Sequence, residues 1–129
     1  MIIEDNYADV VASVKEQIDY DYLLTCEKMD PDLIDCVVEL IAEGYLSKEP
    51  ETFIARERRP MEVVRDRFLH LTSEHIIYVF DRMNATETEV KNIRQYLRAV
   101  LFNAPATMGV YYGRKVFEDQ MGIRRRKSE

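Results

Sequence analysis

The chain of 129 residues is long enough for one domain with a hydrophobic core of its own, without disulfide or metal staples. Hydrophobic residues make up 47% of the chain, but no run reaches the length of about 18 apolar residues that a membrane-spanning helix needs. The acidic start, MIIEDNYADV, excludes a secretory signal and an Arg-rich transit peptide. Length and composition therefore predict a cytoplasmic protein that does not enter a membrane.

The formal net charge of −6 is unevenly distributed along the sequence. Residues 1–52 hold 14 acidic and 3 basic residues, whereas residues 53–129 hold 10 acidic and 15 basic residues. The two parts therefore carry net charges of −11 and +5. Such a division suggests two charged faces that serve a partner protein or a polyanion.

Apolar residues at helical spacing predict two helices in the first part of the chain. Asn6 is expected to cap the first helix, and Val14 and Ile18 lie on its apolar face. The segment of alternating aspartate and tyrosine at residues 19–22 predicts a stop, followed by a short second helix that ends near Lys28.

A third helix is predicted to begin at Asp30 and Pro31. The acid can cap the first turn, and proline at the first helical position loses no hydrogen bond. Gly44 is expected to cap the C-terminal end of this helix. Residues 48–59 lose the helical period, so we expect one short strand or an extended loop there.

Two more helices are predicted after Pro60, the first starting at this proline and the second capped by Thr72 or Ser73. The core residues expected in the first of them are Met61, Val64, Phe68 and Leu71. The core residues expected in the second are Ile76, Val79, Phe80 and Met83.

The last part of the chain predicts a helix, a break and a final helix. Thr86 and Glu89 fit a capping box, and an apolar stripe follows them. Pro105 is expected to end this helix and begin the last one, because proline inside a helix costs about 3 kcal/mol. Gly109 and Gly113 then share one ridge, where we expect them to let the last helix pack closely on the body.

Together these elements predict an all-α fold, a compact bundle of about six helices with at most one short strand or hairpin. We expect a single helical domain over residues 1–122. Residues 123–129 are expected to form a flexible basic tail, and its arginines are Arg124, Arg125 and Arg126.

No pattern in the sequence predicts catalysis, a cofactor or a metal site. His70 and His75 do not form an HExxH motif, and no GxSxG, P-loop or GxGxxG motif is present. Cys26 and Cys36 form no CxxC motif, so we interpret them as small hydrophobic residues in a reducing compartment. We therefore expect a protein that is not an enzyme and that holds no metal or cofactor.

Two charged stripes are the main candidates for contact with a partner. The acidic stripe, at helical spacing on the third predicted helix, consists of Asp32, Asp35, Glu39 and Glu43. The basic stripe, on the helix after the capping box, consists of Lys91, Arg94 and Arg98, and it is extended along the sequence by Arg114, Lys115 and the tail. Each stripe is either the solvated side of an amphipathic helix or a surface for electrostatic docking.

Other residues are candidates for the same role. A second basic cluster surrounds the strand-like segment and consists of Arg56, Arg58, Arg59, Arg65 and Arg67. The tyrosines Tyr96, Tyr111 and Tyr112 either pack in or at the rim of the core or stack on nucleic-acid bases.

Three blocks of the sequence resemble a known family. They read IDYDYLL at 18–24, VVRDRFLHLTSEHIIYVFDRM at 63–83 and NIRQYLRAVLFNAPATMGVYY at 92–112. Together they resemble the C-terminal domain of RepA_N-type replication initiators, which occur on plasmids and mobile elements of low-GC Gram-positive bacteria. That domain is similar to the helical domain of DnaD-like primosome proteins. The resemblance covers roughly residues 7–121, and the third block is its most specific part.

The resemblance implies a non-enzymatic C-terminal module that docks a host replication protein, with primase as the favoured partner. In the family a winged-helix domain that binds the origin precedes this module. We therefore expect this chain to be an excised domain, a truncated gene product or a stand-alone relative. DnaD-like domains also carry a Tyr-x-x-x-Ile-x-x-x-Trp pattern linked to DNA binding; its nearest match here is Tyr96, Val100 and Ala104, and the chain has no tryptophan.

The sequence thus leaves three hypotheses open. The first is docking of a host replication protein through charged helix faces and exposed tyrosines. The second is DNA binding through the basic stripe and tail, for which affinity falls steeply with salt. The third is self-association, with the acidic stripe of one copy against the basic stripe of another.

Overall fold

The structure, a computed structural model, describes residues 3–85 and 91–121. Within these ranges the chain forms six helices and one antiparallel hairpin: α1 (Ile3–Gln17), α2 (Tyr20–Leu24), α3 (Pro31–Leu46), β1 (Glu51–Ile54), β2 (Glu57–Pro60), α4 (Met61–Leu69), α5 (Ser73–Ala85) and α6 (Ile93–Met121). The predicted mainly helical fold class is confirmed. None of the helices in this part of the chain is long and apolar enough to cross a bilayer.

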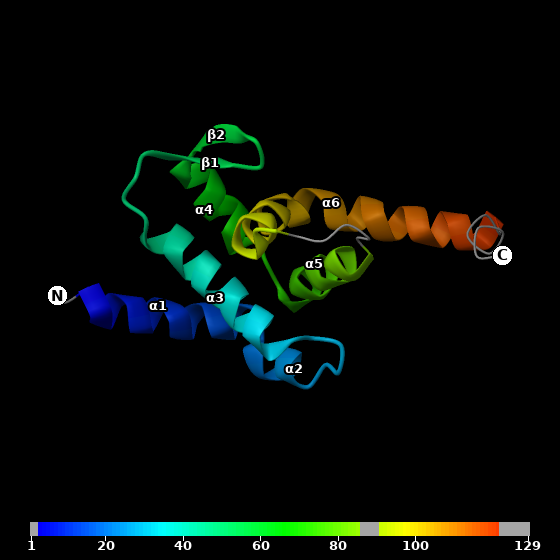
Figure 1. Ribbon diagram of the computed structural model, residues 1–129, viewed down its shortest axis with the longest axis horizontal. Coiled ribbons are helices and arrows are strands. Elements are labelled where there is room, and N and C mark those ends of the chain that lie inside the picture. Colours follow the sequence, from blue (N-terminus) through cyan, green and yellow to red (C-terminus); the bar gives the residue numbers. More distant parts are fainter. Residues whose placement is uncertain (1–2, 86–90, 122–129) are drawn as a thin grey trace.

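Helix α3 is the centre of the fold, since it contacts α1, α2, α4 and α6. Figure 1 shows the hairpin beyond α4, and it shows α6 passing α5 and extending away from the body. Side chains from all six helices and from β1 form one continuous core. The four core positions predicted for the helix after Pro60 are all buried, three of them in α4 and Leu71 just after it. Helix α5 buries three of its four predicted positions, with Met83 half-buried. Tyr78 is a fully buried residue that the helical pattern did not single out.

The helix starts follow the predicted signals only in part. The Asp30 carboxylate accepts a hydrogen bond from the backbone N–H of Asp32 at 2.9 Å, which confirms the cap of α3. The predicted stop before α2 is also confirmed, because Asp19 has a left-handed backbone with a φ of 56°. The cap predicted at Asn6 is wrong, since α1 begins at Ile3. Asparagine costs less than about 1 kcal/mol inside a helix, so the helix continues through it.

Gly44 is not a helix cap. Helix α3 continues to Leu46, and Gly44 is buried against α4. A Cβ atom at this position would lie 2.8 Å from two ring atoms of Phe68, which is closer than side chains approach. The glycine is therefore needed where α3 and α4 pack against each other.

The segment predicted as one strand or a loop forms a complete hairpin. Thr52 pairs with Arg59 and Phe53 with Arg58, and Ala55 and Arg56 form the tip. Both tip residues have positive φ values, 52° and 70°. Two-residue hairpin tips of this kind favour Asn-Gly, because residues with a side chain pay roughly 1–2 kcal/mol each in the left-handed region. The tip is therefore strained.

The break predicted at Pro105 is also wrong. Helix α6 runs through this proline for 29 residues. The proline removes the N–H that would bond the carbonyl of Leu101, four residues earlier. The next two carbonyls also accept side-chain hydrogen bonds: Arg67 Nη1 donates to that of Phe102 at 3.2 Å, and Thr107 Oγ1 donates to that of Asn103 at 3.1 Å. Proline bends a helix that it does not break, and in Figure 1 α6 changes direction between its yellow first turns and its orange part.

The glycine ridge after Pro105 does not face the body. Among the described residues, no atom outside the local helix lies within 4 Å of a Cβ built on Gly109 or Gly113. The close packing predicted for this ridge is therefore wrong. The capping box of Thr86 and Glu89 and the tail of residues 123–129 lie outside the described residues. The first turn of α6 is instead capped by Asn92, whose Oδ1 accepts from the N–H of Gln95 at 3.0 Å.

Candidate functional site

The predicted acidic and basic stripes meet each other within one chain, at the surface between α3 and α6. Arg94 of α6 lies across two turns of α3, with Nη2 2.7 Å from Oε2 of Glu43 and Nη1 3.6 Å from Oε1 of Glu39. The hydrogen bond from the guanidinium to Glu43 raises the pKa of Arg94 above its ordinary value. These three residues therefore hold α3 and α6 together, and the predicted docking stripe is in this part an internal contact.

The remaining acids of the stripe lie near the start of α3. Asp35 accepts a hydrogen bond from the hydroxyl group of Tyr20 in α2, and this bond raises the pKa of Tyr20. Asp32 is exposed in the first turn of the helix, where a negative charge suits the helix dipole. Three of the four acidic residues thus contact α2 or α6.

The basic stripe is divided as well. Arg98 donates to the carbonyl of Phe53 at 3.0 Å and to Oγ1 of Thr52 at 2.9 Å, so it ties the hairpin to α6. Burial lowers the pKa of Arg98. Its guanidinium is the donor of both of these bonds. Lys91 is exposed and precedes the helix, so it does not share the face predicted for it.

The two tyrosines of α6 belong to an aromatic cluster with Tyr78. The ring centroids of Tyr78, Tyr111 and Tyr112 are 5.2–5.8 Å apart, all in edge-to-face geometry. The hydroxyl group of Tyr112 donates to Oδ2 of Asp81 at 2.7 Å. Burial and this hydrogen bond raise the pKa of Tyr112 well above its ordinary value. The pair therefore anchors α6 on α5 and is not free to stack on bases.

The other predicted contact residues have separate positions. Arg114 is exposed and forms an ion pair with Glu118 one turn later, with 3.1 Å between Nε and Oε1. Lys115 lies over the ring of Tyr111, with Nζ 5.2 Å from the ring centroid. Arg124, Arg125 and Arg126 lie outside the described residues.

The histidines and cysteines have structural surroundings. Nδ1 of His75 accepts from the backbone N–H of Thr72 at 3.0 Å, which caps the start of α5, and burial lowers the pKa of His75. Cys26 and Cys36 are half-buried thiols, and burial raises the pKa of Cys36. Within residues 3–85 and 91–121 no group of three or more His, Cys, Asp or Glu side chains is arranged to hold a metal.

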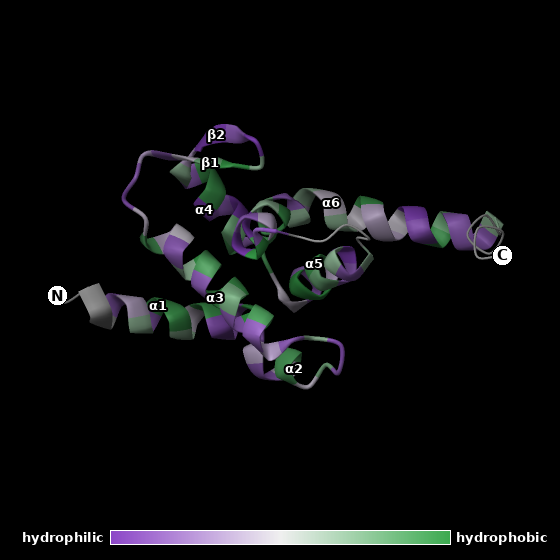
Figure 2. Ribbon diagram, viewed as in Figure 1, coloured by the Kyte–Doolittle hydropathy of each residue, from purple (hydrophilic) through white to green (hydrophobic). Residues whose placement is uncertain are grey.

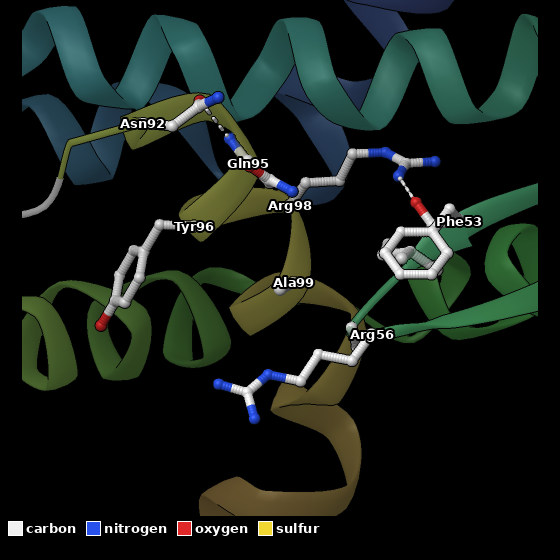
Figure 3. A pocket seen from close by; sticks show the side chains of 9 residues that line it. Phe53, Arg56, Asn92, Gln95, Tyr96, Arg98 and Ala99 are labelled. Atoms are coloured by element: carbon white, nitrogen blue, oxygen red, sulfur yellow. Dashed lines mark hydrogen bonds between the residues drawn. The ribbon is translucent and has the colours of Figure 1, made fainter.

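An open groove lies between the hairpin and the first turns of α6, as Figure 3 shows. It has a volume of about 340 Å³. The hairpin supplies Phe53, Ile54, Ala55 and Arg56, and the α6 side supplies Asn92, Gln95, Tyr96, Arg98 and Ala99. The ring of Phe53 is 56% exposed, whereas Tyr96 is half-buried. Arg56 is exposed and makes no hydrogen bond or ion pair with any described residue.

Residues 2–122 match the sequence model of a family described as a family of unknown function (DUF6017). The chain belongs to this family. The matched region contains both walls of the groove and every described helix and strand. No curated protein and no solved structure matches the chain.

The chemistry of the groove suits binding. Its lining offers two aromatic rings, the guanidinium of Arg56 and the amides of Asn92 and Gln95, but no carboxylate, thiol or imidazole. Such a surface can hold an extended segment that carries an apolar side chain and a carboxylate. Sequence reasoning placed Arg56 and Tyr96 among possible contact residues but not Phe53 or Gln95. The signal that was available for Phe53 is a large aromatic residue in a short polar strand.

Proposed function

We propose that the chain is a non-enzymatic docking module of a plasmid or mobile-element replication initiator, acting in the cytoplasm. It binds a segment of a host replication protein, primase being the favoured partner, in the groove between the hairpin and α6. The observation that carries this proposal is the placement of an uncommitted Arg56, at a strained hairpin tip, in the groove that the exposed Phe53 also lines. The resemblance of the three sequence blocks to the initiator family supports the class of partner.

The strain at the tip supports a role for the side chain it carries. Arg56 occupies a left-handed position that glycine fills at no steric cost. Strained backbone of this kind is concentrated at functional sites, where it holds a group in place. Here the strained position belongs to a cation that lines the same groove as two aromatic residues, a combination that can recognise an acidic segment with an apolar anchor.

The walls of the groove are fixed before any partner arrives. Arg98 ties β1 to α6 with two hydrogen bonds, and Arg59 donates from β2 to the carbonyl groups of Ile54 and Ala55 at 3.1 and 3.3 Å. A preformed site loses little conformational freedom on binding, so more of the contact energy appears as affinity. This rigidity supports docking of a short segment by a domain of modest size.

The contacts of the basic stripe favour protein docking over DNA binding. Arg94 forms ion pairs with carboxylates of α3, and Arg98 donates hydrogen bonds to the hairpin. A phosphate would have to compete with these internal partners. Of the three residues of the basic stripe, Lys91 is exposed and precedes the helix, so the described stripe offers a phosphate backbone few uncommitted cations.

The test is capture of replication proteins from a host lysate by the immobilised full chain, followed by titration of the retained purified protein. We expect primase, replicative helicase or its loader to be retained, and we expect the double variant Phe53→Ala with Arg56→Ala to bind it at least tenfold more weakly. A matched control is Arg58→Ala, since Arg58 is an exposed arginine of the same hairpin that pairs with Glu51 and does not line the groove.

Two outcomes would contradict the proposal. If none of these replication proteins is retained, the proposed class of partner is wrong. If the double variant binds as tightly as the wild type, the groove is not the binding site. A labelled single-stranded oligonucleotide at low salt provides the third arm. A strong mobility shift that Arg56→Ala abolishes would assign the groove to DNA.

A further inference from the structure

The C-terminal part of α6 turns its apolar side toward solvent. Eight residues that share one side of this helix are all exposed: Ala106, Gly109, Val110, Gly113, Val116, Phe117, Gln120 and Met121, which we call the outer face. The exposed fractions are 71% for Val110, 55% for Val116, 51% for Phe117 and 58% for Met121. Gln120 is the one polar member, and no member is charged. Figure 2 shows apolar turns recurring along the part of α6 that extends past α5.

The opposite side of the same segment contacts the body or carries charge. Tyr111 and Tyr112 pack on α5, and Lys115 and Glu118 follow on that side. A surface helix usually packs its apolar side on the body, but this segment turns its apolar side to solvent and keeps polar residues nearer the body. Contiguous apolar surface of this kind is uncommon on a monomer and marks an interaction site.

We propose that the outer face is the contact between two copies of this chain, with the two α6 helices packed antiparallel. The shape of the outer face is self-complementary. Gly109 and Gly113 form a shallow strip without side chains, and Phe117 and Met121 form two projections one and two turns farther on. In an antiparallel pair, Phe117 lies on Gly113 of the second copy, and Met121 lies on Gly109 of the second copy.

A two-fold axis relates the two copies, so each of these contacts occurs twice in the dimer. Every projection of one copy meets a glycine of the other, which is the isologous contact that closed dimers use. The glycines let the helix axes approach closely, and the large side chains then fill the remaining space. A face that had only projections, or only glycines, would need a different partner to be covered.

The available area fits a dimer of moderate affinity. From their exposed fractions, the four large side chains offer on the order of 400 Å² of apolar surface per copy. With the small residues and Gln120 included, the two copies together approach about 1,200 Å², the lower end of specific interfaces. Each copy carries a net charge of −6, but the outer face itself holds no charged residue, and the nearby Arg114 already forms an ion pair with Glu118 of its own helix.

The surface differs from the one in the self-association hypothesis drawn from the sequence. That hypothesis paired the acidic stripe of one copy with the basic stripe of another, and these stripes meet within one chain through Arg94 and Glu43. The outer face shares no residue with the groove. Dimerisation and docking are therefore tested by separate variants.

The first experiment is sedimentation velocity of the full chain from about 5 to 500 µM, the range in which an interface of this size is expected to associate. We expect a monomer–dimer equilibrium for the wild-type chain. Val110→Asp and Phe117→Asp are each expected to raise the dissociation constant at least tenfold. Leu69→Asp is the control, because Leu69 is a 63% exposed apolar residue of α4 outside the outer face.

Three results would overturn the contact. They are a wild-type chain that stays monomeric at the highest concentration, outer-face variants that dimerise as tightly as the wild type, and a control that dissociates the dimer equally. Circular dichroism of each variant checks that it is folded. Because all three substituted side chains are exposed, we expect unchanged helix content.

A second experiment tests the antiparallel arrangement. In a background with Cys26→Ala and Cys36→Ala, the substitutions Val110→Cys and Gln120→Cys are made in separate chains, since these positions face each other across the proposed contact. Oxidation is expected to cross-link the two variants when they are mixed, and to cross-link neither efficiently alone. Efficient cross-linking of each variant with itself, without mixed dimers, would show equal residues face to face and would overturn the proposed pairing.

Discussion

The first turns of α6 carry Arg94 and Arg98, and both side chains reach partners on other elements. The last turns carry Val116, Phe117 and Met121, each more than half exposed. Charged side chains are therefore bonded to other elements of the fold at one end of the helix, and apolar side chains are left uncovered at the other. The difference teaches that the pattern along a helix shows which residues share a side, while the neighbours decide which side is covered.

Two phenylalanines of this helix give the largest expected contrast. Phe102 is fully buried, and its ring lies between the guanidinium groups of Arg59 and Arg67, at 4.7 and 4.4 Å from the ring centroid. Phe102→Ala is expected to lower the free energy of unfolding by about 3–5 kcal/mol. Phe117→Ala is expected to change it by less than about 0.5 kcal/mol. Urea unfolding measured well below the concentration of dimer formation compares the two, and equal losses would contradict the contrast.

Two arginines give the second contrast. Arg98→Ala is expected to cost about 2 kcal/mol, because it leaves the carbonyl of Phe53 and the hydroxyl of Thr52 without their donor. Arg114→Ala removes an exposed ion pair with Glu118 and is expected to cost less than about 0.5 kcal/mol. Thermal unfolding of both variants provides the measurement. A larger loss from Arg114→Ala would mean that the C-terminal part of α6 contributes more to the fold than its contacts indicate.

Tyr112 marks the point where α6 leaves the body, and Tyr112→Phe is expected to cost about 1–2 kcal/mol through loss of its bond to Asp81. The pKa of this hydroxyl is raised in the folded state, so its contribution is complete below the unfolded value of about 10 and is lost as the pH rises through the folded value. The free energy of unfolding of the wild type is therefore expected to fall above about pH 10, and that of Tyr112→Phe to fall less steeply. Parallel curves for the two proteins would exclude this role of Tyr112.

The smallest effect is expected at the hairpin tip, and it has the opposite sign. Arg56→Gly relieves a left-handed arginine and is expected to raise the free energy of unfolding by about 0.5–1 kcal/mol. The same change removes the cation of the groove, so binding of the replication protein is expected to weaken. Chemical unfolding and partner titration of one preparation measure both. A variant that is less stable would show that the tip is not strained.

Several local sequence signals gave the right outcome, although the cap predicted at Asn6 did not. Asp30 and Pro31 predicted the start of α3, and the spacing of Met61, Val64 and Phe68 predicted the buried side of α4. These features depend on one or two turns of backbone. No distant contact is needed for a carboxylate to cap the N–H groups beside it.

Most of the sequence predictions that proved wrong depended on distant residues. Gly44 reads as a cap from its neighbours, but its place is set by the ring of Phe68. Pro105 reads as a break, but Arg67 of α4 bonds a carbonyl close to it and the helix continues. The groove joins a hairpin tip to the start of α6, about 40 residues apart in the chain, and no local pattern connects the two.

The sequence by itself determined a helical chain, most of its helix starts, the residues that share each helix side, and the division of charge between its two parts. Only the tertiary structure decided that the acidic and basic stripes meet through Arg94, that Tyr111 and Tyr112 anchor α6 on α5, and that the outer face stays uncovered. The physical reason is that helical periodicity is a property of adjacent turns, whereas burial and pairing depend on which distant surfaces come together.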